Sequence, residues 1–270
     1  MNLSKALMVE PGKKIELDRR DPDSTGRFKS KKAAYAVMEK NLERLGELQS
    51  VLYAENQRSV LIVLQAMDAG GKDGTIKHVM GPLNPQSCKV CSFKTPTDEE
   101  LSHDFLWRIH KQTPRKGEIV IFNRSHYEDV LIARVRQFVD KKVWSKRYGQ
   151  INDFEKLLAE NNTHILKFFL HISKDEQLKR LRERIDEPAK NWKINPQDFE
   201  ERQYWADYIR AYEEALSRCS TPDAPWFVIP ANKKWFRNYA VSQIVTEALE
   251  AMNMAYPKPD IDVSKLRKMS

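Results

Sequence analysis

The chain has 270 residues, a length that suits one large α/β domain and leaves little room for a second independent one. Its apolar fraction of 41% and its six tryptophans argue against a disordered chain. No stretch approaches the ~18 apolar residues of a membrane span and no secretory signal pattern opens the chain, so we expect a cytoplasmic protein without a membrane partner. The formal net charge of +8 suggests a polyanionic partner, although a solvated lysine-rich surface would also account for it.

Strand-like and helix-like patterns alternate along the chain. Residues 1–30 are expected to form a loosely docked extension and residues 256–270 a charged tail, so the domain itself should span 31–255. Residues 31–55 have the apolar spacing of an amphipathic helix, and the β-branched run at 59–65 is typical of a strand buried on both faces. Further strands are expected at 88–93, 118–123, 164–172 and 226–231, and further helices at 98–112, 127–139, 144–161, 174–185 and 196–218, with another beginning near Lys72. This alternation predicts an α/β fold with a central parallel sheet between two helical layers.

Three cysteines occur, and Cys88 and Cys91 form a C-x-x-C pair. Such a pair can signal zinc or redox chemistry. It lies in the strand-like segment 88–93 with no second cysteine pair and no matching histidine, whereas a structural zinc site needs four ligands. Buried thiols in a reducing compartment are therefore the favoured interpretation.

The segment Leu64–Thr75, LQAMDAGGKDGT, joins the expected central strand to the next helix and resembles a Walker A loop. It departs from the G-x-x-x-x-G-K-[ST] pattern at both ends, with Ala66 for the first glycine and Asp73 for the hydroxyl residue. The two consecutive glycines still allow successive N–H groups to face an anion, and Lys72 adds a mobile positive charge. The residues expected to hold phosphate here are Ala69, Gly70, Gly71, Lys72, Gly74 and Thr75.

Two carboxylates, Asp68 and Asp73, lie in or beside this loop. They would repel phosphate unless a cation lay between, so we expect them to bind Mg²⁺, or Mn²⁺ in its place, directly or through water. A structural alternative remains for each. Asp73 could favour the helix dipole as an acid of the first turn, and Asp68 could be a turn residue.

A second polar cluster follows the strand expected at 118–123. Asn123, Arg124, Ser125 and Tyr127 would face the first loop, because the carboxyl ends of parallel strands share the edge where ligands bind. The guanidinium of Arg124 suits the charge of a phosphoryl group in transfer. Ser125 could at the same time cap the following helix.

The segment 174–200 is strongly basic and is broken by Pro188. A basic helix, a turn at proline and further basic residues fit a lid that closes over phosphates and excludes water. The alternative is a solvated helix whose acidic residues make local ion pairs. The basic residues assigned to the lid are Arg180, Arg184, Lys190 and Lys193.

Four ordered segments together resemble the polyphosphate kinase 2 family: AMDAGGKDG, FNRSHYEDV, ISKDEQLKRLRERIDEPAKNWKINPQDFEERQYW and DAPWFVIPANKKWFRNY. The resemblance spans roughly residues 52–251. It implies a P-loop kinase fold like that of thymidylate kinase, a three-layer α/β/α arrangement with a helical lid. It also implies transfer of a terminal phosphoryl group between inorganic polyphosphate and a nucleotide.

The resemblance also implies roles for single residues. Asp68 would bind magnesium and orient the acceptor phosphate, Lys72 would hold phosphate, and Asp73 would stand near the metal. Arg124 would neutralise the transferring group, which makes Asp68, Lys72 and Arg124 the expected catalytic residues. The family often has an aspartate where this chain has Asn123, which argues against a direct metal role at that position.

Binding residues follow from the same comparison of motifs. Arg134 matches a family arginine near the site and, with Lys193, is expected to bind polyphosphate. Nucleotide or lid contacts are expected from Asn123, Tyr127, Glu128, Arg180, Arg184 and Lys190.

The second motif, read as F-N-R-S-x-Y-E-D, resembles the class III subgroup, which phosphorylates both AMP and ADP. The expected activity is therefore reversible, magnesium-dependent, in-line transfer from polyphosphate to AMP and ADP by a homodimer or homotetramer. An ATP-dependent nucleotide kinase on the same fold is the first alternative. A nucleic-acid-binding module is the second, but no zinc-finger spacing, helix-turn-helix signal or aromatic RNA motif supports it.

Overall fold

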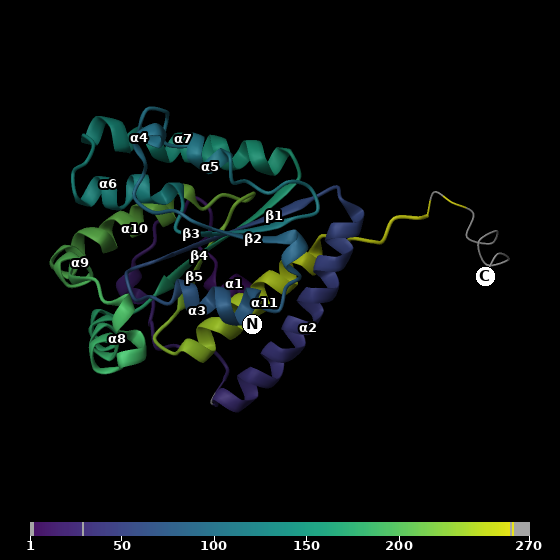
Figure 1. The fold of residues 1–270 in the computed structure, drawn as a ribbon, viewed down its shortest axis with the longest axis horizontal. Coiled ribbons are helices and arrows are strands. Elements are labelled where there is room, and N and C mark those ends of the chain that lie inside the picture. The colour runs from purple at the N-terminus through teal and green to yellow at the C-terminus, as the bar shows by residue number, and fades with distance from the viewer. Residues whose placement is uncertain (1–2, 29, 260, 262–270) are drawn as a thin grey trace.

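The computed structural model describes residues 3–28, 30–259 and 261. Five parallel strands form one sheet in the order β2-β3-β1-β4-β5 at the centre of the fold (Figure 1). Their bounds are Ser59–Ala66 for β1, Cys88–Ser92 for β2, Ile119–Asn123 for β3, Thr163–His171 for β4 and Trp226–Pro230 for β5. All five predicted strands are confirmed, each to within one residue at either end.

The central strand β1 is buried along its whole length between two parallel neighbours. Val60, Ile62 and Leu64 belong to the hydrophobic core on one face of the sheet, and Leu61 and Val63 to the core on the other. This division follows from the two-residue period of a strand, and it explains why the sequence is an unbroken apolar run.

Helices cover both faces of the sheet (Figure 1). Helices α7 (Lys141–Glu160) and α10 (Trp205–Cys219) pack on the face of Leu61, and helices α2 (Lys31–Glu55) and α11 (Lys234–Ala251) pack on the opposite face. The shorter helices are α1 Leu3–Leu7, α3 Lys72–Thr75, α4 Asp98–Leu101, α5 Trp107–His110, α6 Ile132–Val135, α8 Lys174–Asp186 and α9 Pro196–Glu200. The three-layer α/β/α architecture is thus confirmed, and no helix in the described ranges is both long and apolar enough to cross a membrane.

Three of the predicted helices are interrupted. In 196–218 a 3-10 turn at Glu201–Tyr204 separates α9 from α10. In 98–112 the helices α4 and α5 are separate, because the hydroxyl of Ser102 donates to a carbonyl one turn back (2.7 Å) and the carboxylate of Asp104 accepts an N–H two residues on (2.9 Å). Such side-chain bonds compete with the bonds of a continuing helix. In 127–139 a 3-10 turn at His126–Val130 precedes the short α6.

The amino-terminal extension is not loosely docked, so this expectation is wrong. The Val9 N–H donates to the carbonyl of Trp226 (2.8 Å), and Met8 forms an antiparallel bridge with Phe227. Val9 and Leu17 are buried. The extension therefore covers the outer edge of β5, which would otherwise expose unpaired backbone groups. Most of the predicted tail at 256–270 lies outside the described residues.

Candidate active site

A cleft of about 840 Å³ opens where β1, β2 and β3 end. Its walls come from the loop after β1, the residues that follow β2 and β3, the segment 180–198 and the start of α11. This is the edge at which parallel α/β sheets bind ligands. The lining includes most of the predicted site residues: Asp68, Ala69, Gly70, Gly71, Lys72, Asp73, Gly74, Asn123, Arg124, Arg180, Arg184, Lys190 and Lys193.

Backbone conformation explains both consecutive glycines of the loop. A Cβ atom at Gly70 would lie 2.5 Å from Ala66 Cβ and 2.8 Å from the Met67 carbonyl oxygen, which no side chain tolerates. Gly71 has φ of 104°, a conformation that L-residues rarely adopt. Ala69, with φ of 58°, is also left-handed. The conformation of the loop therefore requires glycine at position 70, where a Cβ atom has no room, and favours glycine at position 71, where φ is positive.

Lys72 and Thr75 have different surroundings. The Lys72 ammonium donates to the Ala66 carbonyl (3.2 Å) across the loop. Burial lowers the pKa of Lys72, and the positive charge of Arg124 lowers it further. Thr75 is buried, and its hydroxyl donates to the Gly71 carbonyl (3.2 Å). Lys72 borders the cleft as predicted, whereas Thr75 does not, because its side chain closes the first turn of α3 instead.

The two polar clusters meet at the sheet edge. Leu64 of β1 lies opposite Asn123 of β3, so the residues that follow the two strands are brought together. Arg124 Nη2 donates to Asp68 Oδ1 (3.0 Å), and Asn123 Nδ2 donates to Asp73 Oδ1 (2.9 Å). Arg124 has φ of 62°, a strained conformation of the kind that clusters at functional sites.

The donor set of the cleft suits a hard divalent cation. No group of three or more His, Cys, Asp or Glu side chains within the described ranges could hold a metal by itself. Mg²⁺ commonly takes one or two carboxylates and completes its shell with phosphate oxygens and water. The half-buried Asp68 and the exposed Asp73 provide that number of carboxylates.

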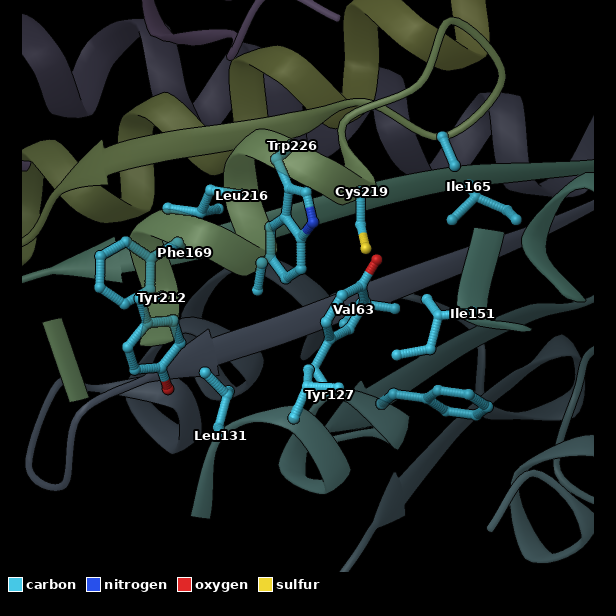
Figure 2. Packing of buried hydrophobic residues seen from close by; sticks show 14 of the residues in the cluster. Val63, Tyr127, Leu131, Ile151, Ile165, Phe169, Tyr212, Leu216, Cys219 and Trp226 are labelled. Atoms are coloured by element: carbon cyan, nitrogen blue, oxygen red, sulfur yellow. The ribbon is translucent and has the colours of Figure 1, made fainter. Parts of the chain in front are cut away.

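Tyr127 does not face the cleft, contrary to the prediction. It is completely buried, and Figure 2 shows it in the core with its hydroxyl directed toward Cys219. That hydroxyl donates to Glu155 Oε1 (2.9 Å) and accepts from Lys167 Nζ (2.9 Å). Burial raises the pKa of Tyr127. The residue anchors the segment of Arg124 to the core instead of contacting a ligand.

Arg134 and Glu128 also lie outside the cleft lining. Arg134 Nη1 donates to Glu214 (2.6 Å) and to the Tyr148 hydroxyl (2.9 Å), so it joins α6 to α7 and α10. These contacts give Arg134 a role in joining helices, and its binding of polyphosphate stays a prediction. Glu128 is half-buried behind the site; burial raises its pKa, and the positive charges of Arg124 and Lys72 oppose the rise.

Arg180 holds the phosphate loop from behind. Its side chain is buried on α8, and Nε donates to Glu176 (2.8 Å). Its two terminal nitrogens donate to four backbone carbonyls, at distances of 2.6–3.1 Å: those of Ala69, Gly70, Ala231 and Asn232. The first half of α8 is thus a fixed support of the loop, and Arg180 is not a free lid residue.

The second half of the basic segment covers the cleft more loosely. Arg184 donates to Asp198 Oδ2 (2.7 Å) and to the Lys193 carbonyl (3.1 Å), which ties α8 to the 3-10 turn Pro188–Lys193 and to α9. Lys190 pairs with Glu187 (2.7 Å). The predicted lid therefore narrows to residues 184–200.

Among the cleft-lining residues that sequence reasoning missed are Asp198, Trp192 and Arg237. Burial and the nearby charge of Asp68 raise the pKa of Asp198. Trp192 is 78% exposed, with Lys193 Nζ 4.8 Å from its ring centre. The run of basic residues around Arg237 was the available signal, because net positive charge beside a phosphate loop indicates an anion site.

The C-x-x-C pair makes no metal site. All three cysteines are free, and burial raises the pKa of Cys88 to about 11. Burial also raises the pKa of Cys91, whose thiol donates to Gln112 (3.4 Å). The interpretation as protonated structural thiols fits these surroundings.

Comparison with known proteins agrees with this geometry. Residues 28–257 match the family model described as Polyphosphate kinase 2 (PPK2). The chain is 54% identical to an AMP/ADP-polyphosphate phosphotransferase of Meiothermus ruber, over 97% of this chain and 98% of the relative. It is 46% identical to an ADP-polyphosphate phosphotransferase of Rhodopseudomonas palustris, over 94% of this chain and 92% of the relative. The crystal structure of Polyphosphate Kinase 2 from Arthrobacter aurescens TC1 superposes with a TM-score of 0.96 at 46% identity, covering 100% of this chain and 96% of that one. The fold, the phosphate loop and these matches together establish that the chain belongs to the polyphosphate kinase 2 family.

Proposed function

We propose that the protein transfers the terminal phosphoryl group of inorganic polyphosphate to AMP and to ADP, giving ADP and ATP. The observation that carries this proposal is the pairing of Asp68, in the phosphate loop, with Arg124, which follows β3. The carboxylate can hold a metal ion and the guanidinium beside it can hold a phosphate. Transfer between two phosphate chains requires both to be bound close together. Action on both nucleotides is supported by the name of the Meiothermus ruber relative.

Electrostatics dominates the mechanism, because donor and acceptor are both anions that must be brought into line. Lys72 and Arg124 both line the cleft and would neutralise oxygens of the group in transfer. Asp68 and Asp73 would hold Mg²⁺, or Mn²⁺ in its place, and the metal would supply positive charge to the reacting phosphates. The acceptor is already a phosphate, so transfer needs no covalent intermediate on the protein and is reversible in principle.

The lid residues would complete the site. Lys190 and Lys193 stand on the 3-10 turn that faces the loop, and each could exchange its present contact for a phosphate oxygen. Arg184 would keep this turn in place through Asp198. Closure of residues 184–200 would exclude water and so favour transfer to the nucleotide over hydrolysis.

The remaining expectations stay part of this proposal: a cytoplasmic enzyme that acts as a homodimer or homotetramer. An ATP-dependent nucleotide kinase on the same fold is the competing function. The two are separated by incubating AMP with long-chain polyphosphate as the sole donor and following ADP and ATP by chromatography. Formation of both supports the proposal, and turnover that requires ATP as donor refutes it.

A further inference from the structure

Arg237 is a buried cation that has no anionic partner among the residues that the structure describes. Its side chain on α11 is 2% exposed, and its Nε and Nη2 atoms donate to Asn238 Oδ1 (3.1 and 2.8 Å). Across the described residues no carboxylate forms an ion pair with Arg237 and no acceptor is found for its Nη1 atom. The guanidinium nevertheless borders the cleft.

The phosphate loop is shaped to admit this guanidinium. A Cβ atom at Gly71 would lie 1.8 Å from Arg237 Nη1, and a Cβ atom at Gly74 would lie 2.9 Å from Nη2. Both glycines therefore leave the space that the guanidinium occupies against the start of α3. The same Cβ position at Gly71 is 3.6 Å from Arg180 Nη1, so two guanidinium groups stand close together here.

The two arginines differ in how they are satisfied. Arg180 is saturated by four carbonyls and Glu176, whereas Arg237 keeps one terminal nitrogen free. An unpaired buried charge is costly, and a second cation beside it adds repulsion. Burial and the charge of Arg180 lower the pKa of Arg237 to about 9, so it remains protonated at neutral pH. An anion that arrived at the free nitrogen would relieve both costs.

The charge around Arg237 indicates which anion. Lys31 and Lys234 line the same cleft, and Glu183, an acidic residue of the lining, already lies near both Lys190 (3.8 Å) and Lys234 (3.7 Å). Asp68 and Asp73, the proposed metal ligands, instead pair with Arg124 and Asn123 at the end of β3. A phosphate at Arg237 would thus be neutralised by cationic side chains without a metal, which suits the inner residues of a phosphate chain.

We propose that Arg237 binds an inner phosphate of the polyphosphate donor, on the α11 side of the loop, while the terminal phosphate lies at Lys72 and Arg124. This inference rests on the proposed function and adds a donor subsite to it. A guanidinium can give two parallel hydrogen bonds to one phosphate, and its position in the core fixes that geometry before the ligand arrives. The donor chain is thereby held in register for transfer.

The test is equilibrium binding of inorganic tripolyphosphate and, separately, of AMP, measured by calorimetry on the full chain. Arg237→Gln should weaken tripolyphosphate binding about 10- to 100-fold, as expected for lost hydrogen bonds between charged groups, and should leave AMP binding within about twofold. Arg237→Lys should recover part of the loss. Arg210→Gln, an exposed arginine paired with Asp207, controls for net charge and should change neither affinity.

Gly74→Ala provides a second test that keeps Arg237 in place, since its methyl group would displace the guanidinium while alanine suits a helix. It should also weaken tripolyphosphate binding, and it decides the matter if Arg237→Gln does not fold. Tripolyphosphate affinity within about threefold of wild type in a folded Arg237→Gln variant would overturn the inference, as would a selective loss of AMP binding. Failure of the wild-type protein to bind tripolyphosphate would instead refute the proposed function.

Discussion

Replacement of Arg180 by methionine separates a structural role from a ligand-binding role. Methionine fills a similar volume but leaves four backbone carbonyls, two of them in the phosphate loop, and Glu176 without their donor. Individual hydrogen bonds to a charged group contribute ~1.5–3 kcal/mol, but they are not additive, and loss of one partner from a buried charged network costs about 3–5 kcal/mol. That is a large part of a typical total stability of about 5–15 kcal/mol. It corresponds to a fall in Tm of about 6–20 °C for a domain of this size.

Urea denaturation followed by circular dichroism gives the free energy of unfolding directly. The control is Arg182→Met, an exposed arginine on the same helix, for which we expect a change within about 0.5 kcal/mol. If Arg180 supports the phosphate loop, Arg180→Met should lower both the free energy of unfolding and kcat. If Arg180→Met lost less than about 1 kcal/mol and only raised KM for polyphosphate, Arg180 would be a phosphate contact and our account of it would be wrong.

Three further predictions concern catalysis, the buried ion pair and the thiols. Asp68→Asn should lower kcat at least about 100-fold in a coupled assay with little change in Tm, since its partner Arg124 is 43% exposed; wild-type turnover would contradict the assignment. Lys167→Met should cost about 3–5 kcal/mol in urea denaturation by removing the lysine that pairs with the buried Glu155, and Glu155→Gln in the same chain should restore most of it. Burial raises the pKa of Cys88 to about 11 and that of Cys219 to about 12, so only about 0.1% of Cys88 is thiolate at pH 8. Native labelling by a thiol reagent should therefore be slow and rise about tenfold per pH unit, and fast labelling at pH 7.5 would rule this out.

The strands and the phosphate loop could be predicted from the sequence because their signals are local. An unbroken apolar run such as 59–65 fits few structures besides a strand buried on both faces. Consecutive glycines followed by a lysine after such a strand likewise define a loop around an anion. The meeting of Asp68 with Arg124 followed from one further rule, that parallel strands end at the same edge.

The differences between prediction and structure have a common cause, which is that the sequence gives a residue type but not its partner. Tyr127 and Arg134 carry groups that suit a ligand, yet each is satisfied by side chains from distant helices, Glu155 and Glu214 respectively. Basic character alone could not show that Arg180 faces the back of the loop. Such contacts exist only once the layers have packed.

Helix α11 (Lys234–Ala251) was not predicted from the sequence, and the reason is a different one. Most of its residues are buried, including the polar side chains of Arg237, Asn238 and Ser242, so apolar residues do not form a single stripe along it. A helix that is buried on several sides lacks the periodicity by which surface helices are recognised. The same burial hid Arg237 as a candidate site residue.

The central claim is that polyphosphate, and not ATP, is the phosphoryl donor. The most direct measurement supplies AMP, Mg²⁺ and long-chain polyphosphate to the purified protein with no ATP present, and follows the products by ³¹P NMR. We predict that ADP appears first and ATP second while the terminal groups of polyphosphate are consumed, and that both stop when the metal is chelated. Absence of ADP under these conditions, with rapid phosphorylation of AMP once ATP is added, would contradict the account.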